Sequence, residues 1–334
     1  LLLFLILIFI AIPCLYSQKY IVDWAKTFTG TGWNRVTAIT SDTDNNIILA
    51  GAFDNSCDIG QSFYNSKSFH DQVLVKYDSA GAVLLTKHFS SNLYAETPAL
   101  LTQENGDIIL AGTFRDSLLV DGALIQSSKV SALFVASLDP AGNIKWSKVL
   151  ATAPGIHINS ICKDGTGNIY LSGSFRKQTV FVTGQLTAKG QSDIFLAKVT
   201  PTGNLSWVKQ IGGQGNDQPQ KVLWYNQNIF LAGNYNKDIE VPVSLTSSEY
   251  GNSFILMFSE SGQPIATKTL AGNNKNLIIG MTIDREGNIY TAGNFKKQLE
   301  PEQGQFFNTA TVAGFVTKFS NNLNYQWTRI IGEG

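Results

Sequence analysis

The chain is poor in charge: Asp, Glu, Lys and Arg make up 15% of its 334 residues, well below the roughly 25% of ordinary soluble domains. The 25 basic residues balance the 25 acidic ones, so the net charge is zero. Without excess positive charge, the chain lacks the attraction on which general binding to nucleic acid or to anionic lipid depends. We therefore expect neither nucleic acid nor a membrane surface as a partner.

Cysteine and histidine are scarce as well. Outside the N-terminal segment only Cys57 and Cys162 remain, and they stand at different places in the repeats described below, so no disulfide framework is expected. The histidines show no spacing typical of metal ligands: they are His70, His88 and His157. No G-x-S-x-G motif of a hydrolase nucleophile occurs. The sequence thus predicts no catalytic, cofactor-binding or metal-binding residues.

The first residues differ from the rest of the chain. Leu1 to Pro13 form an apolar run that fits the core of a signal peptide and is shorter than the about 20 residues that cross a bilayer as a helix. We interpret residues 1–17 as a signal peptide cleaved after Ser17. A membrane anchor and a lipid attached at Cys14 are the alternatives. The mature chain is then predicted to be secreted or displayed at a cell surface, without a membrane span.

A repeat of about 60 residues extends through the remaining sequence. Its marker is a glycine that closes an apolar run, as in IILAGAF or IYLSGSF, and successive marker glycines lie 61, 61, 60 and 60 residues apart. These glycines are Gly51, Gly112, Gly173, Gly233 and Gly293. A constant period of this kind is typical of propellers and solenoids. We therefore predict one domain at residues 20–334, with repeats at about 29–89, 90–150, 151–211, 212–271 and 272–331.

Each repeat contains the pattern of two β-hairpins. In the third copy, His157–Phe175 consists of two short runs rich in β-branched and aromatic residues around a turn at Asp164–Asn168. A second pair of runs follows at Asp193–Ile211 around the turn Pro201–Asn204. Hairpins are expected where such runs flank Asp, Gly and Asn. Four strands in about 60 residues, without helical periodicity, predict an all-β fold in which each repeat is one β-propeller blade.

A tryptophan recurs in the last strand of the repeat, and we expect it to pack between neighbouring blades because it buries a large apolar area. It is present as Trp24, Trp146, Trp207 and Trp327, with Leu85 and Thr267 in the remaining copies. The other motifs follow in a fixed order: G-G-x-G-N-D at Gly212–Asp217, then D-x-x-G-N-I-Y, A-G-x-F and D-I-F-L-A-K.

Together these motifs resemble the SBBP repeat family, the β-propeller repeat of secreted bacterial proteins, from Trp24 to Gly334. The sequence departs from the pattern at Leu85 and Thr267, which replace Trp, and at Leu323, which replaces a turn glycine. The resemblance implies a secreted or surface repeat protein, often one module of a larger adhesive or scaffold polypeptide. It implies no catalytic residues.

The number of blades depends on the first strand. A lone Trp strand at Tyr20–Phe28 precedes five complete units, and the fifth unit already has its own Trp strand. Our hypothesis is that three further strands pair with Tyr20–Phe28, which gives a propeller of six or more blades. A five-bladed ring with one surplus strand is the alternative.

Acidic residues at turns raise the question of calcium. The turns that begin at Asp42, Asp164 and Asp284 lack the ligand order of an EF-hand loop. Gly212–Asp217 is similar to one nonapeptide of calcium-binding β-rolls, but those sites need stacked copies. We interpret the segments that begin at Asp42, Asp164 and Asp284 as hairpin turns, and we expect no calcium.

Asp71 and Asp193 begin equivalent strands, and we interpret them as solvated strand starts.

The evenness of the repeats bears on function. Propeller enzymes are expected to lengthen a few loops around the catalytic site, whereas these units differ by one residue in length. The sequence therefore predicts that the chain is not an enzyme but a scaffold that binds a protein or a glycan, as a monomeric module of a larger polypeptide. The alternative is an extracytoplasmic hydrolase or lyase with its site in the axial channel. Partner, binding face and oligomeric state stay open.

Overall fold

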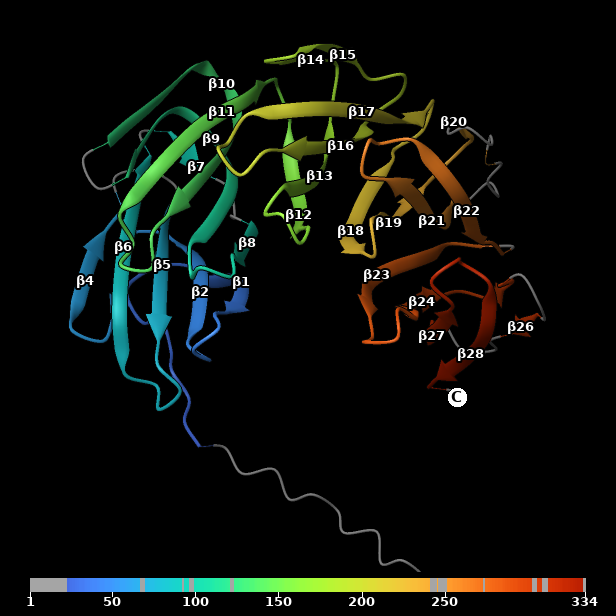
Figure 1. Ribbon diagram of the computed structural model, residues 1–334, viewed down its shortest axis with the longest axis horizontal. Coiled ribbons are helices and arrows are strands. Elements are labelled where there is room, and N and C mark those ends of the chain that lie inside the picture. Colours follow the sequence, from blue (N-terminus) through green and yellow to red (C-terminus); the bar gives the residue numbers. More distant parts are fainter. Residues whose placement is uncertain are drawn as a thin grey trace, which may run out of the picture.

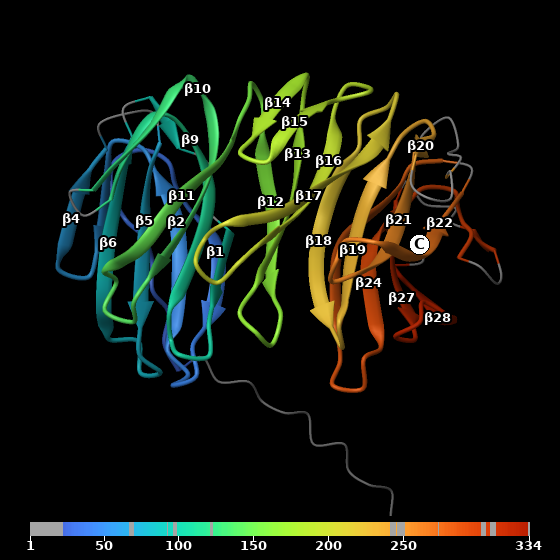
Figure 2. The ribbon, with the colours of Figure 1, turned by 45° about the horizontal axis from the view of Figure 1, so that its top comes forward.

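The computed structural model describes residues 23–332, except for positions 67–69, 92, 96–98, 121–122, 241–244, 246–250, 273, 302–304 and 308–311. The predicted signal peptide at residues 1–17 lies outside the described residues. Within them the chain forms strands and turns and no helix. Five four-stranded antiparallel units follow one another (Figures 1 and 2), so the predicted all-β propeller fold is confirmed.

The blades are numbered in chain order, and their strands are given from the inner to the outer edge. Blade 1 consists of β1 (Asn34–Ser41), β2 (Ile47–Phe53), β5 (Asp71–Tyr77) and β6 (Val83–Ser91). Blade 2 consists of β8 (Ala99–Thr102), β9 (Ile108–Val120), β10 (Ala123–Leu138) and β11 (Ile144–Thr152). Blade 3 consists of β12 (His157–Lys163), β13 (Ile169–Phe175), β16 (Asp193–Val199) and β17 (Leu205–Gly213). Blade 4 consists of β18 (Gln218–Tyr225), β19 (Asn228–Tyr235), β21 (Asn252–Ser259) and β22 (Pro264–Leu270). Blade 5 consists of β23 (Asn276–Ile283), β24 (Ile289–Phe295), β27 (Ala313–Phe319) and β28 (Tyr325–Ile331).

Short strands are inserted between the two middle strands of the blades. They are β3 (Ser56–Ile59), β4 (Ser62–Asn65), β14 (Gln178–Phe181), β15 (Gly184–Thr187), β20 (Ile239–Glu240), β25 (Gln298–Leu299) and β26 (Phe306–Phe307), whereas blade 2 extends β9 and β10 instead and adds β7 (Tyr94–Ala95) before β8. In blades 1, 2 and 3 the end of the outer strand pairs with the insertion of the next blade, as in β11 with β14 and β17 with β20. These backbone hydrogen bonds join neighbouring blades at their outer edges.

The segment before blade 1 makes the same connection. Thr29 pairs with Asp58 of β3 through an antiparallel bridge. Trp24 packs against the ring of Tyr77, with 5.9 Å between ring centroids. Residues 23–28 therefore occupy the place of an outer strand beside blade 1, although they are not themselves in a strand.

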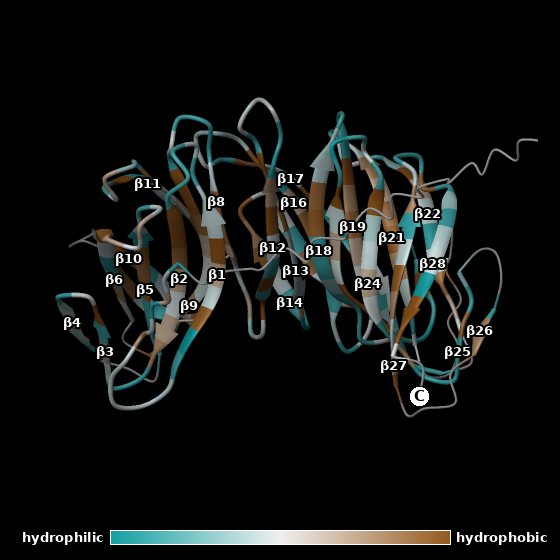
Figure 3. Cartoon of the chain, turned by 90° about the horizontal axis from the view of Figure 1, so that it is seen from below, coloured by the Kyte–Doolittle hydropathy of each residue, from teal (hydrophilic) through white to brown (hydrophobic). Residues whose placement is uncertain are grey.

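The hydrophobic core is divided among the spaces between the blades. Each large cluster of buried side chains combines residues of two neighbouring sheets: blades 1 and 2, 2 and 3, 3 and 4, and 4 and 5. A smaller cluster lies on blade 1 and includes Phe28 from the preceding segment. Figure 3 shows the hydrophobic residues along the strands and hydrophilic ones at many turns. A single blade could not bury both of its apolar faces alone, so each repeat is stable only when it packs against its neighbours.

The inner strands β1, β8, β12, β18 and β23 surround a common axis, and each contacts the next along the chain. Blades 1 and 5 face each other across the open side of this arc (Figures 1 and 2), with no contact between their sheets as extensive as those between neighbouring blades. The described blades thus form an arc around the axis and not a closed ring.

The recurring tryptophan packs between blades, as its size predicts. Trp207 of blade 3 lies against the last turn of blade 4, where a Cβ added to Gly262 would be 3.2 Å from the ring. Its Nε1 donates to the Glu260 carbonyl at 3.2 Å. In blade 4, however, the turn comes one residue earlier, so Ala266 and not Thr267 occupies the tryptophan position, opposite Met257. The assignment of Thr267 from spacing alone is therefore wrong.

Candidate functional site

A cleft at the axis is the first candidate site. It has a volume of about 310 Å³ and is lined by strands of blades 1 to 4. Its lining residues are Thr37, Ala38, Ile39, Ala99, Leu100, Ile158, Asn159, Ser160, Ile161 and Lys221. Six of the ten lining residues are apolar, and the other four contribute an amide, two hydroxyls and one amino group.

A β-bulge shapes this wall. The register of the inner strand shifts by one residue at the same place in four blades, so that Thr37, Asn159, Gln220 and Ile279 have no partner across the sheet. A bulge bends a strand and changes the direction of its side chains. In blade 3, Ser160 directly follows the unpaired Asn159. Its Oγ accepts a hydrogen bond from the Val222 N–H of blade 4 at 3.2 Å. This bond joins the inner strands β12 and β18 beside the cleft.

The composition of this cleft limits its chemistry. None of its described lining residues is Asp or Glu, although glycoside cleavage generally relies on two carboxyl groups. None is aromatic either, so sugar rings would find no stacking surface there. Ile39 is 68% exposed. An exposed apolar side chain beside Lys221 and Asn159 suits an apolar peptide segment better than a sugar.

A second cleft, of about 350 Å³, lies at the turns between blades 2 and 3. It is lined by Gln103, Glu104, Asn105, Asp107, Ile109, Ser137, Lys145, Lys163, Asp164, Gly165, Thr166, Gly167 and Pro201. The Lys145 amino group lies 2.5 Å from Asp107 Oδ2. Burial lowers the pKa of Lys163, against the opposing effect of the nearby Glu104 charge. Charges of both signs are thus present in this cleft.

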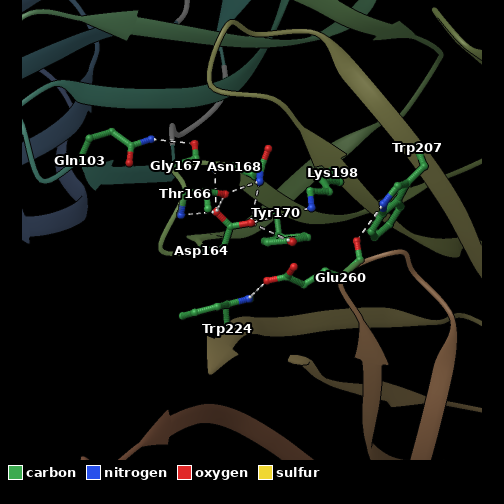
Figure 4. Close-up of polar contacts among 10 residues, drawn as sticks. All are labelled: Gln103, Asp164, Thr166, Gly167, Asn168, Tyr170, Lys198, Trp207, Trp224 and Glu260. Carbon is green, nitrogen blue, oxygen red and sulfur yellow. Dashed lines mark hydrogen bonds and ion pairs between the residues drawn. The ribbon is translucent and has the colours of Figure 1, made fainter. Parts of the chain in front are cut away.

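Asp164 is the most strongly bonded carboxylate of the second cleft (Figure 4). Its Oδ1 accepts the backbone N–H of Thr166 and of Asn168 at 2.9 Å each, and Tyr170 donates to its Oδ2 at 3.1 Å. Burial acts to raise the pKa of Asp164, but the bonds from Asn168 and Thr166 outweigh it, so this pKa lies below its ordinary value. Because both oxygens are engaged, Asp164 holds the turn and is not available for proton transfer.

The tyrosine beside this turn connects it to the neighbouring blade. Lys198 Nζ lies 5.2 Å from the centre of the Tyr170 ring, and Trp207 packs on the same ring with 6.2 Å between centroids. Glu260 accepts from Trp224 Nε1 at 2.9 Å through Oε1 (Figure 4). Burial, and then the Asp164 charge, raises the pKa of Tyr170 above its ordinary value. The aromatic groups of this region therefore serve packing between blades 3 and 4.

The other acidic turns behave in the same way. Asp42 accepts from the backbone of Asp44 and Asn46 and forms an ion pair with Lys76 at 2.8 Å. Asp284 accepts from the backbone of Asn288 at 2.8 Å. The interpretation of these segments as hairpin turns is confirmed. No group of three or more His, Cys, Asp or Glu in the described part of the chain could hold a metal ion.

The interpretation of Asp71 and Asp193 as solvated strand starts is wrong, because both are fully buried. Asp71 bonds to His88 Nε2 at 2.8 Å and to the Ser91 N–H at 3.2 Å. Asp193 accepts from Gln210 Nε2 at 2.6 Å. The outer strand folds over the start of its neighbour and covers it, a contact that the spacing of the repeat does not reveal.

The remaining titratable candidates are thiols. Cys57 and Cys162 are both free. Burial, with a contribution from the Asp58 charge, raises the pKa of Cys57 to about 11, and burial raises that of Cys162 further. Neither thiol has the lowered pKa that favours a reactive thiolate.

Among the described residues, no helix is of a length and hydropathy that would let it cross a membrane.

Comparison with known proteins agrees with the repeat architecture. No family model matches the chain. A WD repeat-containing protein of Acanthamoeba polyphaga mimivirus, itself uncharacterized, is 24% identical over 266 residues. These residues are 68% of this chain and 19% of the viral protein, so the chain spans about a fifth of that relative.

Some solved structures are weakly similar to the chain, at low identity. A subtype N10 neuraminidase-like protein of A/little yellow-shouldered bat/Guatemala/060/2010 is 9% identical with a TM-score of 0.46, over 90% of this chain and 83% of the other. A GH43 α-L-arabinofuranosidase of Clostridium thermocellum is 9% identical with a TM-score of 0.39, over 88% and 92%. An exo-1,5-α-L-arabinanase from a bovine ruminal metagenomic library is 10% identical with a TM-score of 0.37, over 92% and 100%.

These structures correct one prediction. The evenness of the repeats predicts that the chain is not an enzyme, and this is contradicted because the similar structures include glycoside hydrolases. The physical reason is that catalysis needs only a few convergent side chains, which strands and short turns can supply without longer loops. The similarity concerns the fold, and no activity of those enzymes is transferred from it. The comparisons support the conclusion that the chain is a β-propeller repeat protein.

Proposed function

We propose that the chain is an extracytoplasmic interaction module that binds an apolar segment of a partner protein in the axial cleft. The observation that carries the proposal is the exposed Ile39 at a cleft that is also lined by Leu100, Ile158 and Ile161. Lys221 adds one positive charge to this wall. The partner segment is therefore expected to carry apolar side chains and a carboxylate.

The same lining favours a protein over a glycan. Sugars are bound by aromatic stacking with hydrogen bonds from amides, and neither cleft has an aromatic group among its described lining residues. The largest fully buried side chains are Phe and Tyr, so much of the aromatic content is used inside the molecule. The resemblance to SBBP repeats and the apolar residues 1–13 support a location outside the cytoplasm.

A phage-displayed peptide library tests the proposal. We expect selected peptides to carry apolar residues with Asp or Glu, and to lose binding at least about 10-fold when Ile39→Asp or Lys221→Glu is introduced, because each change places an unfavourable charge at the contact. Val182→Asp is the matched control, since Val182 is 67% exposed and lies in the β14–β15 turn. Peptides that bind all variants equally, or a chain that selects only ligands on a glycan array, would contradict the proposal.

A further inference from the structure

Two buried carboxylates meet at the junction of blades 3 and 4. Asp193 is the first residue of β16, and Asp217 directly precedes β18. Both side chains belong to residues with no exposed surface. The end of β17 lies between them: a Cβ added to Gly212 would be 2.5 Å from the Asp193 carboxyl carbon, and the Gly213 N–H donates to Asp217 Oδ2 at 2.9 Å. Two successive glycines of β17 thus lie next to the two carboxyl groups, one glycine beside each.

Each carboxylate has one oxygen without a partner. Asp193 Oδ2 accepts from Gln210 Nε2 at 2.6 Å and from the Lys189 N–H at 3.2 Å, whereas its Oδ1 accepts nothing. Asp217 Oδ2 accepts from Gly213, and its Oδ1 accepts nothing. Buried polar atoms are bonded in the large majority of cases, so two unpaired carboxylate oxygens at one junction require an explanation. A nearby lysine or arginine would explain the two carboxylates by balancing their charge, but neither aspartate forms an ion pair with a described residue.

The surroundings of Asp217 disfavour its charged form. Burial, with a smaller contribution from the Asp193 charge, raises the pKa of Asp217 to about 7, against the lowering effect of the Gly213 bond. Two buried negative charges without a counter-charge are unfavourable, and a cation between them would remove the conflict.

Backbone carbonyl groups lie close together in the two segments that hold the aspartates. The segments 189–193 and 212–217 are joined by backbone bonds, the Gln191 N–H to the Gly215 carbonyl at 2.8 Å and the Asp217 N–H to the Ser192 carbonyl at 3.0 Å. A Cβ added to Gly190 would lie 2.5 Å from the carbonyl oxygens of Gly213 and Gly215. Only glycine allows this close approach, which brings the Gly213 and Gly215 carbonyls next to the 189–193 segment.

We propose that Asp193 and Asp217 bind one Ca²⁺ ion at this junction, with neutral oxygens of the 212–217 segment as further ligands. Ca²⁺ accepts six to eight oxygens in irregular arrangements that mix carboxylates and carbonyls. Mg²⁺ demands octahedral geometry and usually keeps several waters, which a junction without exposed surface does not accommodate. The ion would balance both charges and tie β16 of blade 3 to β18 of blade 4.

The next junction provides a natural control. At the corresponding positions between blades 4 and 5 stand Asn252 and Asn276, which are neutral. Asn252 begins β21 opposite Tyr235, just as Asp193 begins β16 opposite Phe175. The variant Asp193→Asn/Asp217→Asn therefore converts one junction to residues that the same fold already uses.

Calorimetric titration of the chelator-treated chain with CaCl₂ tests the proposal, together with thermal unfolding in EDTA and in excess Ca²⁺. We expect binding of about one Ca²⁺ per chain and a midpoint raised by several degrees, because an ion that binds only the folded state stabilises it. MgCl₂ should give a smaller shift. Asp44→Asn, at an exposed turn position, should leave Ca²⁺ binding unchanged.

The single variants Asp193→Asn and Asp217→Asn and the double variant should lose the binding heat and the Ca²⁺-dependent shift. In EDTA the double variant should unfold at or above the midpoint of the original chain, since it no longer buries two charges, and this outcome shows that it folds. The proposal is overturned if the original chain takes up no Ca²⁺, or if the double variant folds and still binds it. A pair that shares one proton in place of a metal would appear as the first of these results.

Discussion

Single aspartates organise the turns of this protein in one recurring way. Asp42, Asp139, Asp164 and Asp284 each accept the backbone N–H of the Asn four residues later through Oδ1, and the amide of the same Asn through Oδ2. Side chains that bond back to the turn in this manner are the reason that Asp and Asn are frequent there. Of the four, Asp42 has in addition a close ion pair, with Lys76 at 2.8 Å.

Asp42 should contribute stability that depends on acid. Burial acts to raise its pKa, but the bonds from Lys76 and Asn46 outweigh it and hold the pKa at about 2. A carboxyl with a lowered pKa stabilises the fold above its unfolded pKa of about 4, and this contribution is lost as the pH falls toward 2. We expect Asp42→Asn to lower the free energy of unfolding by about 2 kcal/mol at pH 7, with a difference that shrinks between pH 4 and 2. Urea unfolding at these pH values measures it, with Asp44→Asn as the control; a difference independent of pH would argue against the ion pair.

At the scale of elements, the contact between blades is a large side chain set against a turn residue in the left-handed region. Trp146 packs on Gly203, whose φ is 85°, and Trp207 packs on Gly262. Between blades 4 and 5 the sizes are exchanged. Ala266 occupies the tryptophan position, and the turn residue is Leu323, fully buried with a φ of 59°. Leu323 and Ala266 lie in one hydrophobic cluster, so the leucine fills the volume that the alanine leaves.

This exchange predicts coupled substitutions. Leu323→Gly relieves the left-handed backbone but opens a cavity, and we expect a net loss of about 1–3 kcal/mol. Ala266→Trp alone should cost a similar amount, about 1–3 kcal/mol, because it overfills the site. The double variant restores the tryptophan–glycine pair found between blades 3 and 4. Its loss of unfolding free energy should therefore be smaller than the sum of the two single losses by at least about 1 kcal/mol.

Chemical unfolding of the four chains measures this coupling. Leu323→Gly combined with Val182→Ala, on the exposed β14–β15 turn, is the control and should be additive. Strict additivity of Ala266→Trp and Leu323→Gly would show that the two positions do not share one volume.

At the scale of the whole molecule, the sequence allowed the blades to be predicted because each repeat carries its own turns and apolar runs at a constant spacing. The contacts between repeats were less accessible. Asp193 and Asp217 are in different repeats, and only the folded chain brings them together beside Gly212. Likewise, one residue fewer before Gly262 moved the tryptophan position from Thr267 to Ala266. Spacing describes what one repeat contains, whereas burial and pairing depend on its neighbour.

The open side of the arc leads to a prediction about closure. Trp24 donates from Nε1 to the Ser79 carbonyl at 3.0 Å and packs beside Gly81, as Trp207 does beside Gly262. Residues 23–28 thus stand where the outer strand of a further blade would be, next to blade 1. A copy of residues 151–200, which holds three inner strands of blade 3 with its insertion, should complete that blade when appended after Gly334. It would pair with the Trp24 segment on one side and with the end of β28 on the other.

We expect the extended chain to unfold in one transition at a higher midpoint than the original, because the added strands would cover the faces of blades 1 and 5 on which no other described blade packs. Its radius of gyration in small-angle scattering should increase little, since the added residues occupy the open side of the arc. Trp24→Ala in the extended chain is the matched control and should remove much of the gain. A separate second transition, or a radius that grows as for an appended tail, would mean that the first and fifth blades do not accept a sixth between them and that residues 23–28 serve only to cover blade 1.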